Sequence, residues 1–296
     1  MLGNTLALLC ALSWSLAVIL LKISGARIHP LVLNLFKNAV GLVLLYISAL
    51  IWEGGLHWPS DRTELFWIFL SGFLGIAVAD TLVLKAMRVL KASHIAVLEC
   101  LFAPFIILLS ILLWDEYPSP LTLLGGSMII GAMFCIPPTS EDEGDLLVSV
   151  KQRWQGILLM ALGLFMIAYG IMVVKPLFAH VPLFTMVTLR MLAGFLGSLL
   201  FLGTLKKRRS LLAELRATPR KDLLFLAAFF SSYLSIILWV AGYTYLQATI
   251  AALLNQTSTI FTVLFAIVFL KERLSRRKIL ALALSLGGVL LITLGG

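Results

Sequence analysis

Residues 91–116 read KASHIAVLECLFAPFIILLSILLWDE, and residues 247–272 read QATIAALLNQTSTIFTVLFAIVFLKE. Each stretch contains about 20 consecutive, mainly apolar residues, which is the length that an α-helix needs to cross a bilayer. With an offset of 156 the stretches match in apolar pattern and at small or polar positions: Ala92 with Ala248, Ser93 with Thr249, Glu99 with Asn255, and Glu116 with Glu272. The chain therefore contains a similar membrane-spanning segment twice.

The duplication extends over the rest of the chain. In the first two apolar runs of each half an offset of 153 aligns Gly3 with Gly156, Lys22 with Lys175, Lys37 with Arg190, and Gly41 with Gly194. A loop between the second and third runs can absorb the change of offset without disturbing helix packing. Apolar helices also align by composition alone, but the paired charges weigh against that alternative. We therefore predict two five-span repeats, and an odd number of spans turns the second repeat upside down relative to the first.

The composition excludes a water-soluble globule. Of the 296 residues 61% are hydrophobic and only 12% are charged, and the mean hydropathy is +1.05. We expect an all-α polytopic membrane protein, because loose backbone polar groups cannot be satisfied in hydrocarbon. The ten predicted transmembrane helices lie at about 3–22, 31–51, 65–84, 92–113, 120–136, 155–174, 183–205, 223–243, 247–270 and 278–295. A polar linker at 138–153 separates a first repeat, 1–137, from a second, 154–296.

The basic residues indicate the orientation. Four of the 23 Lys and Arg residues lie elsewhere (Lys37, Arg62, Lys175 and Arg190), and all others fall in loops that follow odd-numbered spans. By the positive-inside rule these loops are cytoplasmic, so both termini are predicted to be extracytoplasmic in a plasma (inner) membrane. The net charge of +9 is thus a topology signal, and no nucleic-acid partner is expected. The three cysteines lie inside apolar stretches without the spacing of a metal site, so we expect no disulfide, metal or cofactor.

The runs LLWDEYPSPLTLLGGSMIIGA (112–132) and VFLKERLSRRKILALALSLGGVLL (268–291), within the doubled arrangement, resemble the EamA-type members of the drug/metabolite transporter superfamily. The resemblance covers nearly the whole chain. That family commonly has a small-residue start to the fourth helix of each repeat, a Pro within it and an acid before the fifth helix. The matching residues here are Ala92, Ser93, Pro104 and Glu116 in the first half, and Ala248, Thr249 and Glu272 in the second.

Ile260 stands where the second half would have its Pro, so the two fourth helices are not expected to bend alike. The resemblance implies a basket of ten helices around a central substrate cavity that opens to one side of the membrane at a time. Members of the family carry amino acids, nucleotide-related compounds, sugars or toxic organic molecules, so the resemblance does not choose a substrate.

Ionisable residues well inside apolar spans are functional candidates, because a charge at mid-membrane costs from about 3 to over 10 kcal/mol. Lys37 shares a helix face with Asn34, and Arg190 occupies the place that matches Lys37 in the second half. Two cations in one cavity would bind an anionic or carboxylate-bearing substrate. The alternative is that each cation reaches its nearer interface or pairs with an internal acid.

Two acids are candidates for proton coupling. Glu99 is the deeper one, and Asp80 lies about four residues from the end of the third span. A buried carboxylate can take up and release a proton as a cavity opens and closes. Alternatively, Glu99 forms a structural pair with Lys37 or Arg190, and Asp80 lies at the interface and pairs with Lys85.

The polar stretch NQTST of the ninth span is the best neutral binding patch. Asn255 and Thr259 share a helix face there, although hydrogen bonding between helices is an equally good explanation. Trp14 in the first span and Trp239 in the eighth are candidates for cavity lining, against the alternative of packing or facing lipid.

These features predict a secondary transporter of small organic metabolites, such as amino acids or related compounds, that works in the lipid bilayer and exports its substrate. Uniport and proton-coupled antiport both remain open. An ATP-driven pump is disfavoured because the sequence has no GxxxxGK[ST] loop. No enzyme is expected, since HExxH and GxSxG are absent as well. The alternatives are an intramembrane enzyme that uses Glu99, Asp80 or His94 on a lipid-linked substrate, and a non-transporting receptor.

Overall fold

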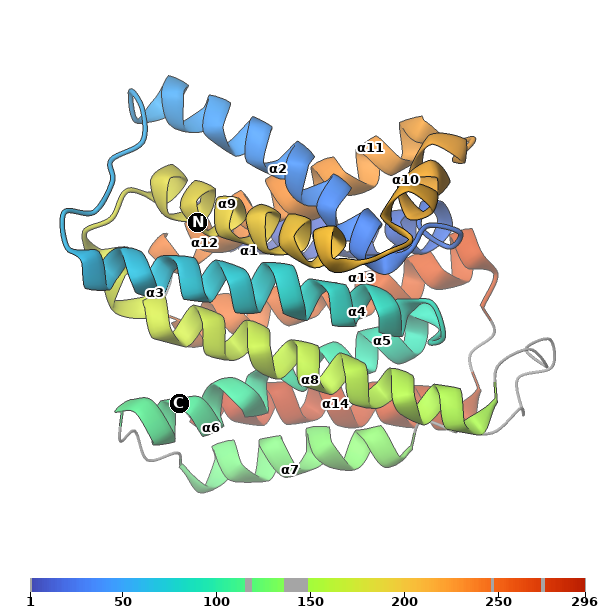
Figure 1. Ribbon diagram of the computed structural model, residues 1–296. Coiled ribbons are helices and arrows are strands. Elements are labelled where there is room, and N and C mark those ends of the chain that lie inside the picture. Colours follow the sequence, from blue (N-terminus) through green and yellow to red (C-terminus); the bar gives the residue numbers. More distant parts are fainter. Residues whose placement is uncertain (1, 115–118, 136–148, 246–247, 273–274, 296) are drawn as a thin grey trace.

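The computed structural model describes residues 2–114, 119–135, 149–245, 248–272 and 275–295, and all regular structure in these ranges is helical (Figure 1). Long helices run side by side and connect at the two ends of the bundle. The elements are α1 (Leu2–Ser24), α2 (Pro30–Trp52), α3 (Arg62–Gly72), η1 (Phe73–Ala79), α4 (Asp80–Met87), α5 (Ala92–Glu99), α6 (Phe102–Trp114), α7 (Pro120–Phe134), α8 (Val150–Val174), η2 (Lys175–Ala179), α9 (Leu183–Thr204), α10 (Arg208–Ala217), α11 (Lys221–Phe229), η3 (Phe230–Leu234), α12 (Ser235–Tyr245), α13 (Ala248–Leu270) and α14 (Arg276–Gly295).

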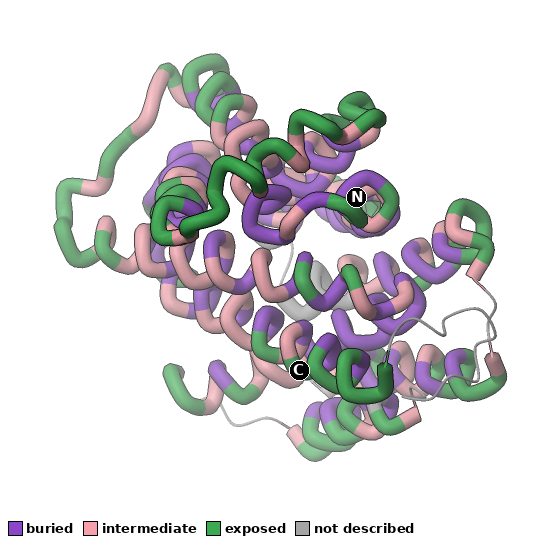
Figure 2. The backbone as a smooth tube through the Cα atoms, turned by 45° about the vertical axis from the view of Figure 1, so that its right-hand side comes forward, coloured by how far each residue is buried: buried purple, intermediate pink, exposed green. Residues whose placement is uncertain are grey.

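The length and apolar character of these helices make the chain a multi-pass membrane protein. Within the described ranges seven helical segments are long and apolar enough to cross a membrane, and Pro120–Ala132 and Leu254–Leu270 are shorter apolar helices. Buried residues gather inside the bundle and exposed residues lie around it (Figure 2). Many exposed side chains are large and apolar, including Leu158 and Val268, and such a surface suits acyl chains.

The two fourth helices of the repeats differ as the sequence predicts. The first is broken at residues 100–101 between α5 and α6, whereas α13 is continuous. Pro104 has no N–H to donate to the carbonyl of Cys100, and its ring would clash with that carbonyl in a regular helix. Ile260 carries neither restriction, so α13 continues past the matching position.

Both third helices of the repeats contain a π-helical segment, which the sequence pattern does not predict. These segments, η1 and η3, occupy matching places in the two halves and pack against the second helix of the opposite half. The position of a Cβ on Gly41 of α2 is filled by Ser232 of η3, and that on Gly194 of α9 is filled by Ile76 of η1. The offsets of 153 and 156 convert one of these contacts into the other, so the two halves pack reciprocally.

Helices α2 and α9, which match each other at the offset of 153, run antiparallel. Glu53 follows the last residue of α2, and its carboxylate accepts hydrogen bonds from the backbone N–H groups of Phe184 (2.6 Å) and Thr185 (2.9 Å) in the first turn of α9. Gly54, with φ of 73°, adopts the left-handed conformation that turns the chain away after Glu53. The end of α2 is thereby held at the start of α9.

A second carboxylate joins the halves at the other end of the bundle. Glu272 accepts hydrogen bonds from the backbone N–H groups of Ala92 (2.7 Å) and Ser93 (3.1 Å) and from the Ser93 hydroxyl (2.8 Å). These groups form the first turn of α5, whose unpaired N–H groups favour an acid. Glu272 therefore acts as a helix cap, whereas Glu116 lies outside the described residues.

The connections depart from the sequence expectation in two places. The basic loop after α9 contains a short helix, α10, with none of its residues buried. Helix α8 begins at Val150, with Ser149 as its N-cap in a capping box with Gln152, inside the range assigned to the linker. Residues 138–148 of that linker lie outside the described residues.

Candidate functional site

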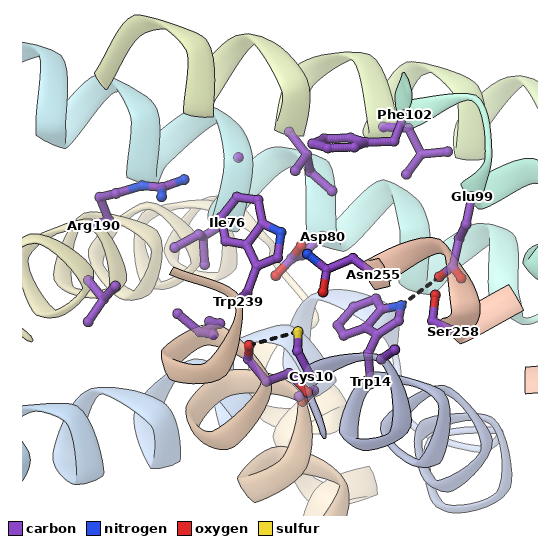
Figure 3. A pocket seen from close by; sticks show the side chains of 18 of the residues that line it. Cys10, Trp14, Ile76, Asp80, Glu99, Phe102, Arg190, Trp239, Asn255 and Ser258 are labelled. Atoms are coloured by element: carbon purple, nitrogen blue, oxygen red, sulfur yellow. Dashed lines mark hydrogen bonds between the residues drawn. The ribbon is translucent and has the colours of Figure 1, made fainter. Parts of the chain in front are cut away.

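A cavity of about 240 Å³ lies between helices of both halves. Most of the candidates that the sequence singles out line it: Trp14, Lys37, Asp80, Glu99, Arg190, Trp239 and Asn255. Arg190 lies at one end and Glu99 toward the other, with Trp239, Asp80 and Asn255 between them (Figure 3). The cavity thus has a basic group at one end, an acid toward the other, and both aromatic and polar side chains between them.

Lys37 forms an ion pair with Asp80 in the wall of the cavity. The distance between Lys37 Nζ and Asp80 Oδ2 is 2.5 Å, and the side chains are 7% and 22% exposed. Lys37 also donates to Asn38 Oδ1 at 3.2 Å. The expectation that Asp80 lies at the interface and pairs with Lys85 is wrong, because η1 and α4 carry Asp80 to the depth of Lys37. Pairing neutralises both charges where an isolated charge would be costly.

Glu99 has a different partner. It is the last residue of α5, next to the helix break, and its Oε1 accepts a hydrogen bond from the indole N–H of Trp14 at 2.9 Å (Figure 3). Its Oε2 has no hydrogen-bond partner among the described residues. The ion pair with Lys37 or Arg190, which was the alternative to a role in proton coupling, does not form among the described residues. One carboxylate oxygen therefore remains available to a proton or a ligand.

Arg190 is a buried cation without an ion pair in the part of the chain that the structure describes. Arg190 is 7% exposed, and its Nε has no hydrogen-bond partner among the described residues. Gly72 allows the backbone of α3 to lie against the backbone of Arg190, because a Cβ at this position would collide with the Arg190 carbonyl. This close packing fixes the place from which the guanidinium extends.

Asn255 supplies further unpaired polar atoms. Neither its Oδ1 nor its Nδ2 has a hydrogen-bond partner among the described residues, although both atoms are buried. It lies beside Trp14 in the cavity (Figure 3). A buried amide normally finds partners, so its unpaired state suits a site that binds a polar ligand.

Comparison with known proteins settles the family. The sequence profile of the EamA-like transporter family matches residues 1–136 and 154–294. The chain belongs to the EamA-like transporter family. A crystal structure of a protein with 16% sequence identity has a TM-score of 0.57 and covers 99% of this chain and 96% of that chain, which shows a shared fold. No curated protein matches the chain.

Two of the candidates lie away from the cavity of this EamA protein. The amide of Asn34 donates to the Ile76 carbonyl (2.8 Å) and to Thr81 Oγ1 (2.9 Å), so it satisfies backbone that the π-helix η1 leaves open. Thr259 donates to the Ala96 carbonyl at 3.4 Å and joins α13 to α5. Both side chains form helix–helix hydrogen bonds, which was the stated alternative for Thr259 but was not anticipated for Asn34.

The cavity also contains residues that the sequence did not single out. Cys10, Phe102 and Ile236 line it, and so does Gln256, whose stretch was singled out only for Asn255 and Thr259. Ser231, Ser235 and Trp239, which recur at every fourth position, line it together, so that spacing was an informative signal. The apolar members carry no signal, because a cavity-facing Ile and a packed Ile look alike in the sequence. No group of three or more His, Cys, Asp or Glu side chains that could hold a metal occurs among the described residues.

Proposed function

We propose that this EamA-family protein is a secondary transporter of small organic metabolites, such as amino acids or related compounds, and that it exports them across a plasma (inner) membrane. The observation that carries the proposal is the central cavity, which is lined by both halves and contains unpaired polar atoms of Glu99, Arg190 and Asn255. A buried site of this kind between two repeats is where secondary transporters bind substrate.

The mechanism is alternating access by two inverted five-span repeats, 1–137 and 154–296. Helices α2 and α9 match each other in sequence and run antiparallel side by side, which supports a two-fold relation whose axis lies in the membrane plane. Rocking one repeat against the other would open the cavity to each side in turn. The distribution of basic residues supports an orientation with both termini on the extracytoplasmic side.

The two ends of the cavity describe the substrate. The guanidinium of Arg190 favours an anionic group, and the free oxygens of Glu99 and Asn255 favour an ammonium or hydroxyl group. Trp14 and Trp239 between these ends favour an apolar or flat body. Amino acids with apolar side chains have all three features.

Glu99 is the residue that we propose to couple transport to protons, with Asp80 as the second candidate. Glu99 has a free oxygen in the cavity, whereas Asp80 is held by Lys37. A carboxylate that binds a proton in one state and releases it in the other would make the protein a proton antiporter. Without such coupling the protein is a uniporter.

Flux in proteoliposomes tests the function. Amino acids are supplied in a panel, and uptake is measured with and without a pH gradient for the wild type and for Glu99→Gln. Glu99→Gln should abolish proton-driven transport and retain exchange. Glu64→Gln is the matched control, because Glu64 pairs with His180 at the end of the bundle, away from the cavity.

Two outcomes contradict the proposal at different levels. Unchanged proton coupling in Glu99→Gln would remove Glu99 from the mechanism. Chemical turnover of a lipid-linked substrate without flux would replace the transporter by an intramembrane enzyme.

A further inference from the structure

The ion pair between Lys37 and Asp80 in the first half has matching positions in the second half, but the residues at those positions cannot form an ion pair. The offset of 153 places Lys37 on Arg190, and the offset of 156 places Asp80 on Ile236. The exchanged contacts of Gly41 with Ser232 and of Gly194 with Ile76 show that the same offsets hold in space. The first half thus has a cation with its acid, and the second half has a cation with an isoleucine.

The consequences for the two cations differ. Lys37 is neutralised by Asp80 at 2.5 Å, whereas Arg190 has no ion pair in the described part of the chain. Arg190 and Ile236 both line the cavity. Arg190 is 7% exposed, and Asp80 acts on it electrostatically only from beyond ion-pair distance. A guanidinium without a direct counter-ion is costly in a low-dielectric interior, and a bound anion would reduce that cost.

We propose that Arg190 is the receptor for a single carboxylate group of the substrate, and that Ile236 determines this specificity by leaving the internal counter-ion position apolar. This inference rests on the proposed function and extends it, since it assigns the anionic end of the substrate to one residue. A guanidinium binds a planar carboxylate through two parallel hydrogen bonds, which fixes its orientation as well as its position.

The charges of the cavity select a monoanionic group over a dianionic one. Asp80 pairs with Lys37, so Arg190 is the one cation of the described cavity lining that is left for a ligand, and Glu99 at the other end offers no positive charge. A dianionic phosphate ester would leave one charge unpaired in the cavity. The cavity, of about 240 Å³, is large enough for a small organic acid.

The assignment of Ile236 can be tested without any ligand. Full-length protein in detergent is compared by thermal unfolding at pH 7 as Ile236→Asp and as Ile236→Asn, each with and without Arg190→Gln. Asn has nearly the size of Asp and lacks its charge. When Arg190 is present, Ile236→Asp should unfold roughly 3 °C or more above Ile236→Asn, because the new acid can form with Arg190 an ion pair equivalent to that of Lys37 and Asp80. This advantage should vanish with Arg190→Gln.

The carboxylate is tested by equilibrium binding of three probes: phenylacetate, its neutral analogue phenylacetamide, and phenyl phosphate. Calorimetry should show that phenylacetate binds the wild type most tightly of the three. Its Kd should rise roughly tenfold or more in Arg190→Gln, as expected for the loss of a charge-assisted hydrogen-bond pair. Ile236→Asp should weaken phenylacetate by a further roughly tenfold beyond any effect of Ile236→Asn, since the new acid competes for Arg190.

Equal unfolding temperatures of the Asp and Asn variants, or the same difference without Arg190, would overturn the role of Ile236. Equal binding of phenylacetamide and phenylacetate would overturn the assignment of Arg190 as the carboxylate receptor. Full binding of phenylacetate to Arg190→Gln would overturn it as well. The Arg190→Gln measurement does not depend on whether Ile236→Asp folds. These measurements report folding and binding, not flux. Absence of flux with an intact carboxylate site would therefore overturn the transporter and leave this inference standing.

Discussion

Replacement of Glu53 by Ala should destabilise the protein through the first turn of α9, a helix that starts in the opposite half of the chain. The carboxylate of Glu53 accepts hydrogen bonds from the N–H groups of Phe184 and Thr185 and from the Thr185 hydroxyl at 2.6, 2.9 and 2.8 Å. Pro182, at the N-cap of α9, makes no side-chain capping hydrogen bond, so Glu53 takes over that role.

The magnitude follows from these contacts. Loss of an N-cap acceptor costs about 1 kcal/mol, and loss of a negative charge at a helix N-terminus costs about 0.3–1 kcal/mol more. The hydrogen bonds of Glu53 are short and charge-assisted, so we expect a total of about 2 kcal/mol. For a chain of this size that corresponds to a decrease of roughly 5 °C in the unfolding temperature.

Thermal unfolding of the purified protein in detergent measures the effect, with Glu64→Ala as the matched control. Glu64 also joins the two halves at this end of the bundle, through His180 at 2.9 Å, but that pair is largely exposed and is worth about 0–1 kcal/mol. Glu53→Gln retains an acceptor and loses the charge, so its unfolding temperature should fall between those of the wild type and Glu53→Ala. An unfolding temperature of Glu53→Ala equal to that of Glu64→Ala would refute the capping argument.

Two further perturbations have matched comparisons in the chain. A Cβ on Gly125 would collide with the carbonyl of Gly288, whereas one on Gly126 meets nothing within 4 Å. Thermal unfolding should therefore show a loss of about 1–3 kcal/mol for Gly125→Ala, and no loss or a gain of up to about 1 kcal/mol for Gly126→Ala. Burial lowers the pKa of His29 from its usual 6.5, and its Nδ1 accepts a hydrogen bond from the N–H of Leu31 in α2. The neutral ring thus stabilises the fold above pH 6.5, and this stabilisation is lost as the pH falls through the lowered pKa. The unfolding temperatures at pH 7 and pH 5 should therefore differ more in the wild type than in His29→Asn. Equal differences in the two proteins would show that His29 does not contribute.

The apolar runs were sufficient to predict helices and their approximate limits, because hydrocarbon allows few other backbone conformations. The repeat also predicted which residues lie near one another: Lys37, Arg190, Glu99 and Asn255 come from four different helices and line one cavity. Matching positions of two inverted repeats lie close together where their side chains face the axis that relates the repeats, so an offset predicts proximity for inward-facing residues.

The partners of these residues could not be predicted. Which acid pairs with Lys37 depends on helix rotation, and the π-helical segment η1 shifts the rotation of everything that follows it, Asp80 included. Asn34 shares a helix face with Lys37 and was expected in the site, but η1 leaves carbonyls that Asn34 binds instead. A local change of helical pitch leaves no mark in an apolar sequence. Here it determines both the acid that pairs with Lys37 and the carbonyl groups that bind Asn34.

The cap on α5 has a consequence for biogenesis. The amide groups at the start of this helix, at Ala92 and Ser93, are completed by Glu272, which the ribosome adds 180 residues after the first of them. Until then the first turn of the helix that carries Glu99 lacks these acceptors. The native cap of this helix, and with it the finished wall of the cavity, therefore forms only after nearly the whole chain has been synthesised.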